Sequence, residues 1–148
     1  MTRRELREHC FKMLFCADFY PAGETKEQIE HYFDAPEEDE MTPEGVMQVL
    51  HNVDLGEKDS DYLKQKTEAI VEKLPELDDR INAVAQGWKT RRMGKVELTI
   101  LRLALYEMLY DEEVPEKVAI NEAVELAKKF GQGESPAFIN GVLARLVP

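Results

Sequence analysis

The spacing of apolar residues predicts that the chain begins with a helix. Thr2 and Glu5 form a capping-box pattern. The apolar residues that follow recur at intervals of three and four: Leu6, Cys10, Met13, Leu14 and Ala17. Because an α-helix has about 3.6 residues per turn, residues at this spacing share one face. The pattern therefore predicts an amphipathic helix that ends near Phe19, before Pro21 and Gly23.

Similar patterns predict helices along most of the remaining chain. Residues 96–109 are apolar on nearly all sides, which is typical of a helix at the centre of a bundle. The segment 118–131 ends at a glycine, and Ser135 and Pro136 are typical of the start of a last helix. Weaker patterns lie within 26–33, 60–74 and 77–88. The sequence predicts an all-α fold: a compact bundle of about seven helices, forming one domain over residues 1–148.

One further helix is predicted in the middle of the chain. Thr42 and Pro43 suit the N-cap and the first position of a helix. The apolar residues that this helix would bury are Val46, Val49, Leu50 and Val53. Gly56 is the expected stop.

The acidic charge of the chain is concentrated in one segment. A hydrophobic content of 43% in 148 residues suffices for a core without metal or disulfide support. Residues 24–61 contain thirteen acidic residues and two lysines, which accounts for the whole net charge of −11. The remainder is neutral and carries two basic stretches, at 3–12 and 89–95. A local cationic site is therefore compatible with an acidic protein.

Several classes of function lack the residues they would need. Cys10 and Cys16 lie on different faces of the predicted first helix, so two free thiols are expected, as in a reducing cytosol. The charged N-terminus and the absence of a long apolar run predict a cytoplasmic protein without membrane contact. His9, His31 and His51 are scattered, and no catalytic motif is present. We therefore expect no metal, no cofactor and no enzymatic activity.

Four blocks of sequence resemble the NusB family of transcription antitermination factors. They are RRELRE (3–8), WKTRR (88–92), LRLALYEM (101–108), and VAINEAVELAKKFG (118–131) followed by FINGVL (138–143). The resemblance implies a compact helical domain with two helical subdomains. It also implies binding to the boxA element of ribosomal RNA leaders together with NusE, a small-subunit ribosomal protein. Such a complex joins the elongating RNA polymerase and suppresses Rho-dependent termination.

The resemblance implies a set of residues that contact single-stranded RNA. They are Arg3, Arg4, Arg7, Lys12, Phe15 and Glu134. Basic groups hold phosphates, and an aromatic ring can stack on an unpaired base. Phe15 stands where many relatives have tyrosine, and core packing is the alternative role for it. Because the three arginines are expected to be exposed, their replacement by alanine is expected to leave the thermal midpoint nearly unchanged.

The resemblance implies contacts with NusE at Glu97 and Arg92. The alternative for Glu97 is stabilisation of a helix N-terminus, and for Arg92 an internal salt bridge. Trp88 is expected to pack inside the protein. Two other functions stay open for the whole chain: an RNA-binding domain related to that of rRNA methyltransferases, and a helical scaffold that binds proteins. RNA binding separates the scaffold from the other two.

Overall fold

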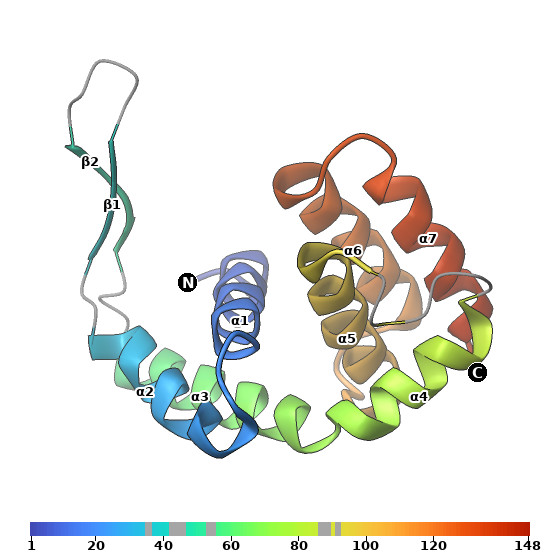
Figure 1. Ribbon diagram of the computed structural model, residues 1–148, viewed down its shortest axis with the longest axis horizontal. Helices are drawn as coiled ribbons and strands as arrows, with labels where there is room; N and C mark the ends of the chain where they lie inside the picture. Colours follow the sequence, from blue (N-terminus) through green and yellow to red (C-terminus); the bar gives the residue numbers. More distant parts are fainter. Residues whose placement is uncertain (35–36, 42–46, 53–55, 86–89, 91–92) are drawn as a thin grey trace.

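Seven α-helices and one β-hairpin make up the described part of the chain in the computed structural model, which covers residues 1–34, 37–41, 47–52, 56–85, 90 and 93–148 (Figure 1). The helices are α1 (Arg3–Ala17), α2 (Thr25–Asp34), α3 (Glu57–Glu72), α4 (Leu74–Val84), α5 (Lys95–Tyr110), α6 (Glu116–Phe130) and α7 (Ser135–Leu146). A short 3₁₀ turn, η1 (Ala22–Glu24), precedes α2. The predicted bundle of about seven helices is confirmed.

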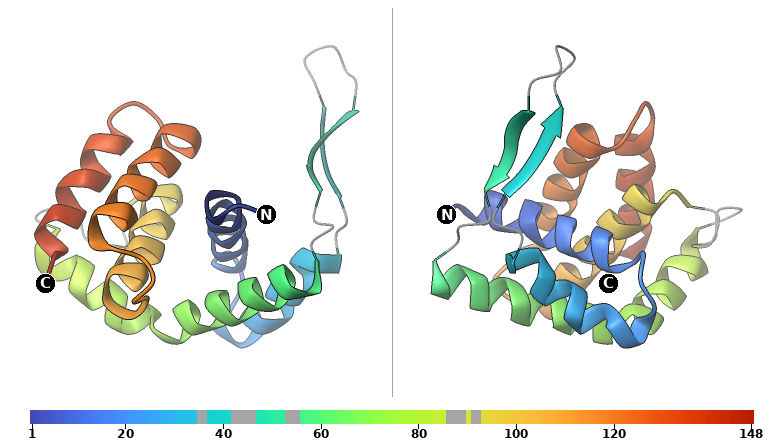
Figure 2. Two further views of the ribbon diagram at one scale, coloured as in Figure 1. Left: turned by 180° about the vertical axis from the view of Figure 1, so that it is seen from behind. Right: turned by 60° about the vertical axis from the view of Figure 1, so that its left-hand side comes forward.

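The prediction of a helix after Thr42 is wrong for the residues of that segment that the structure describes. Residues 47–52 form strand β2 (Met47–Asn52), which pairs antiparallel with β1 (Glu37–Met41). The hairpin projects beyond α2 and α3 (Figures 1 and 2). Three of the four residues assigned to the buried face of that helix are valines, and branching at Cβ favours extended backbone. Of the predicted positions, Thr42, Pro43, Val46 and Val53 lie outside the described residues.

The first helix begins and ends as the sequence predicts. The hydroxyl oxygen of Thr2 accepts a hydrogen bond from the backbone N–H of Glu5 at 3.1 Å, which satisfies one of the free donors at the start of α1. At the other end Asp18 is the C-cap, and Pro21 follows closely. The apolar stripe of α1 is buried, apart from Leu6, which is half-buried.

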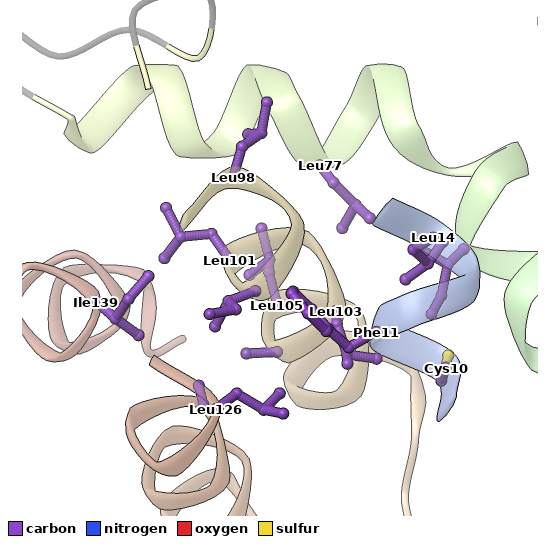
Figure 3. Packing of buried hydrophobic residues seen from close by; sticks show 14 of the residues in the cluster. Cys10, Phe11, Leu14, Leu77, Leu98, Leu101, Leu103, Leu105, Leu126 and Ile139 are labelled. Carbon is purple, nitrogen blue, oxygen red and sulfur yellow. The ribbon is translucent and has the colours of Figure 1, made fainter. Parts of the chain in front are cut away.

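The central position of α5 organises the core. Ile100, Leu101, Leu103 and Leu105 are all essentially inaccessible to solvent. Figure 3 shows α5 side chains between Leu126 and Ile139 on one side and Leu77 and residues of α1 on the other. Helices α1, α2 and α3 contact one another, α4, α6 and α7 contact α5, and α1 also contacts α5. The buried apolar residues of both groups form one cluster. No helix in the described ranges is long and apolar enough to cross a membrane.

Candidate nucleic-acid interface

The three arginines of α1 occupy two different environments. Arg3 and Arg4 are exposed, whereas Arg7 is buried. The side chain of Arg4 is 63% exposed and binds Glu122 of α6 through two hydrogen bonds, Nε to Oε2 at 3.0 Å and Nη2 to Oε1 at 2.9 Å. Two parallel bonds of this kind are the geometry in which a guanidinium also holds a phosphate.

Arg7 is the centre of a buried charge network. Its side chain is 8% exposed and donates to Glu107 of α5, with Nη2 at 2.9 Å from Oε2. Lys66 of α3 lies 3.1 Å from the same oxygen. Burial opposes both positive charges, but their interactions with Glu107 outweigh it, and the pKa values of Arg7 and Lys66 are raised. Glu107 of α5 thus connects to α1 through Arg7 and to α3 through Lys66.

This burial overturns one expectation. Replacing all three arginines was expected to leave stability nearly unchanged because all three were expected to be exposed. Arg7 is buried, and its loss would remove the guanidinium from the buried carboxylate of Glu107 and leave Lys66 as the cation that still faces it. The pattern of α1 alone could not reveal this, because Glu107 lies 100 residues away in the chain. Within the apolar block LRLALYEM, Glu107 looks like a solvent-facing position, but it is fully buried.

Aromatic rings continue along α1 beyond the arginines. Phe11 is 3% exposed and stacks on Phe130 of α6, with ring centroids 4.9 Å apart. Phe15 is half-buried and packs against the core, 6.0 Å from Phe11 and 5.1 Å from the exposed ring of Phe19. Lys12 lies on the same helix and is partly exposed. Phe15 therefore packs against the core and is still partly exposed.

Two predicted site residues from distant parts of the sequence meet at one pocket. The pocket has a volume of about 320 Å³ and is lined by Met93, Gly94, Glu97, Gln132, Glu134, Ser135 and Phe138. The Ser135 hydroxyl donates to Oε1 of Glu97 at 2.5 Å, which connects the start of α5 to the start of α7. Sequence reasoning assigned Ser135 to a helix start, and it missed that Ser135 and Phe138 line the same pocket as Glu97 and Glu134.

The turn between α6 and α7 requires a glycine at position 131. A Cβ atom there would lie 2.7 Å from the backbone oxygen of Ala127 and 2.7 Å from Cβ of Ser135. Since neither contact is with the far end of a flexible side chain, the start of α7 would have to move. Gly131 therefore does more than end α6: it allows Ser135 to reach Glu97.

Gly131→Ala is expected to lower the free energy of unfolding by about 1–3 kcal/mol, because it overpacks this turn. The matched control is Gly141→Ala in α7, where a Cβ would meet nothing within 4 Å. That control should gain about 0.5–1 kcal/mol, because alanine suits a helix interior better than glycine. Urea unfolding of both variants measures the difference. Equal effects of the two substitutions would contradict the close approach at Gly131.

Some predicted residues are not placed by the structure. Arg92 and Trp88 lie outside the described residues.

The two free thiols lie in different environments: Cys10 is buried, and burial raises its pKa, whereas Cys16 is exposed. Within the described ranges, no group of three or more His, Cys, Asp or Glu side chains could hold a metal ion.

Comparisons with known proteins extend over almost the whole chain. The family model described as "NusB family" matches residues 4–148. "Transcription antitermination protein NusB" of Lachnoclostridium phytofermentans is 46% identical over 147 residues, covering 99% of both chains. The protein of the same name from Agathobacter rectalis is 45% identical over 145 residues, covering 98% of both.

Solved structures agree with this similarity. NusB of T. maritima superposes with a TM-score of 0.80 at 28% identity, covering 99% of this chain and 91% of that one. A structure of the antitermination factors NusB and NusE in complex with dsRNA matches with a TM-score of 0.67 at 22% identity, covering 99% and 98%. The second match supports the fold alone. Since the family model and full-length relatives above 40% identity agree, the chain belongs to the NusB family.

Proposed function

We propose that this protein is a transcription antitermination factor. It binds boxA-type RNA of ribosomal RNA leaders together with NusE, joins the elongating RNA polymerase complex and suppresses Rho-dependent termination on rRNA operons. The observation that carries the proposal is the 46% identity to a transcription antitermination protein over 99% of both chains. Because the relatives matched at 46% and 45% identity are transcription antitermination proteins, the alternative of a domain related to rRNA methyltransferases is not favoured.

The geometry supports a division of roles among the predicted RNA-binding residues. The exposed Arg3 and Arg4 are suited to phosphates, with Lys12 further along α1. The partly exposed ring of Phe15 and the pocket beside Glu134 are suited to unstacked bases. Arg7 is 8% exposed and bound to Glu107, so we assign it to the positioning of α1.

Glu97 is the residue through which NusE binding is expected to act, together with Arg92. Ser135 fixes one carboxylate oxygen of Glu97 at the rim of the pocket. A carboxylate held in this way is preorganised for a basic partner. The chemistry proposed is binding without catalysis, in the cytoplasm, by residues 1–148 acting as one RNA-binding domain. The continuous apolar cluster supports that single unit.

A titration of boxA-type RNA, with and without saturating NusE, tests the function. NusE should tighten RNA binding by about fivefold or more, and RNA should tighten NusE binding by the same factor, because linkage is reciprocal. RNA binding by the protein alone should show a shallow salt slope of about −2 to −3, since each phosphate contact contributes about −0.7. Equal RNA affinities with and without NusE, after correction for RNA bound by NusE itself, would leave an RNA-binding protein that is not an antitermination factor.

A further inference from the structure

A groove of about 270 Å³ separates α1 from α6, and charged side chains span it. At the end of the groove near the start of α1, Arg4 binds Glu122 of α6. Next along both helices, Nζ of Lys129 lies 2.8 Å and 2.9 Å from the two carboxylate oxygens of Glu8. The stacked rings of Phe11 and Phe130 follow. The contacts advance together along α1 and α6, so the two helices run in the same direction beside the groove.

The cations of this groove are exposed and yet neutralised. The side chains of Arg4 and Lys129 are 63% and 57% exposed, whereas those of their partners Glu122 and Glu8 are 17% and 24% exposed. The carboxylates therefore form the lower, more buried part of each pair. Each holds its cation through two oxygen contacts, as a phosphate group would.

The groove continues the surface to which RNA binding is assigned. It starts at Arg4 and reaches Lys129, which stands two residues before Gly131 and the turn that forms the pocket of Glu97 and Glu134. A nucleic-acid backbone that follows α1 from its arginines to this pocket would pass Lys129. An exposed ion pair is worth little in water, so a phosphate can displace the carboxylate at small cost.

We propose that the groove between α1 and α6 is a phosphate-binding part of the RNA surface, with Lys129 as a contact, and that Glu122 and Glu8 compete with the RNA backbone for its cations. The inference rests on the proposed function and deepens it. Two carboxylates of the protein thus weaken RNA binding by the free protein. This competition limits nonspecific binding of anions to the exposed cations, because every phosphate must first displace the carboxylate of Glu122 or Glu8.

The test measures binding of a boxA-type RNA oligonucleotide to the full chain and to single variants. Glu122→Gln and Glu8→Gln should each tighten RNA binding by about two- to fivefold, the factor that corresponds to an exposed ion pair. Glu72→Gln is the matched control: it removes the same charge from an exposed position at the end of α3, away from the groove.

Lys129→Ala provides a second, independent readout. It should weaken RNA binding, and in combination with Glu8→Gln it should abolish the gain of the single variant. Circular dichroism shows whether each variant folds. If Glu122→Gln does not fold, the RNA affinity of Glu8→Gln alone provides the test. Unchanged or weaker binding by the folded Gln variants would overturn the proposal, as would an equal gain in Glu72→Gln. A wild-type protein that binds no RNA would overturn the proposed function as well.

Discussion

Glu107→Gln is expected to lower the free energy of unfolding by about 3–5 kcal/mol, the usual cost of removing one partner from a buried ion pair. Glu107 is fully buried, and its carboxylate faces both Arg7 and Lys66. The amide would leave two buried cations next to each other. Asp111, whose Oδ2 is 3.8 Å from Nζ of Lys66, is half-buried and would offset only part of the loss.

The pH dependence of the variant should identify the cause. In the wild-type protein Glu107 raises the pKa of Lys66 above its ordinary 10.5 against the effect of burial. Without that carboxylate burial dominates, and the pKa of folded Lys66 falls below its unfolded value. The unfolded chain then binds more protons, so stability of the variant rises with pH up to about the unfolded pKa. The wild-type protein lacks this rise.

Urea unfolding at several pH values between neutral and alkaline measures both effects. Glu112→Gln is the control, because Glu112 is an exposed carboxylate in the turn after α5 and its loss should change stability by no more than about 0.5 kcal/mol. A loss below about 1 kcal/mol in Glu107→Gln, or a stability that does not rise with pH, would contradict the role of Glu107 as the common partner of two buried cations.

The helices were predictable where local signals agree. The capping box at Thr2, the apolar segment of α5, and Gly131 at the end of α6 each combine a periodic pattern with a defined boundary, and the structure follows them. The helix predicted over 43–53 depended on valines with weak helix preference, and pairing of Met47–Asn52 with Glu37–Met41 replaces it by a strand. Pairing between strands is a nonlocal choice that helical periodicity cannot show.

The geometry of the candidate site was not predictable from the sequence. The family resemblance assigned Glu134 to RNA binding and Glu97 to NusE binding, without relating the two. In the structure, the turn at Gly131 brings both residues to one pocket. Arg4 and Arg7 both lie on α1, and both were predicted to contact RNA. Whether an arginine can bind a ligand depends on where its ion pair lies: Arg4 remains 63% exposed in its pair with Glu122, whereas both Arg7 and Glu107 are buried.

The double substitution Arg3→Ala and Arg4→Ala is expected to reduce affinity for boxA-type RNA by at least about tenfold while the protein stays folded. A hydrogen bond to a charged group contributes about 1.5–3 kcal/mol, and about 1.4 kcal/mol corresponds to a factor of ten. Part of the contribution of Arg4 is offset, because RNA binding must break its bonds to Glu122. Each lost phosphate contact should also make the salt slope shallower by about 0.7.

Stability separates this effect from unfolding. Both side chains are exposed, so the thermal midpoint of the double variant should stay close to that of the wild-type protein. Arg7→Ala, which removes a buried cation, should lower the midpoint strongly, and a triple variant would therefore mix loss of binding with loss of fold. The charge-matched control replaces the exposed Arg80 and Lys117 by alanine on other surfaces. If that control loses as much RNA affinity as the variant of α1, net charge alone determines binding and the N-terminal arginines have no specific role in it.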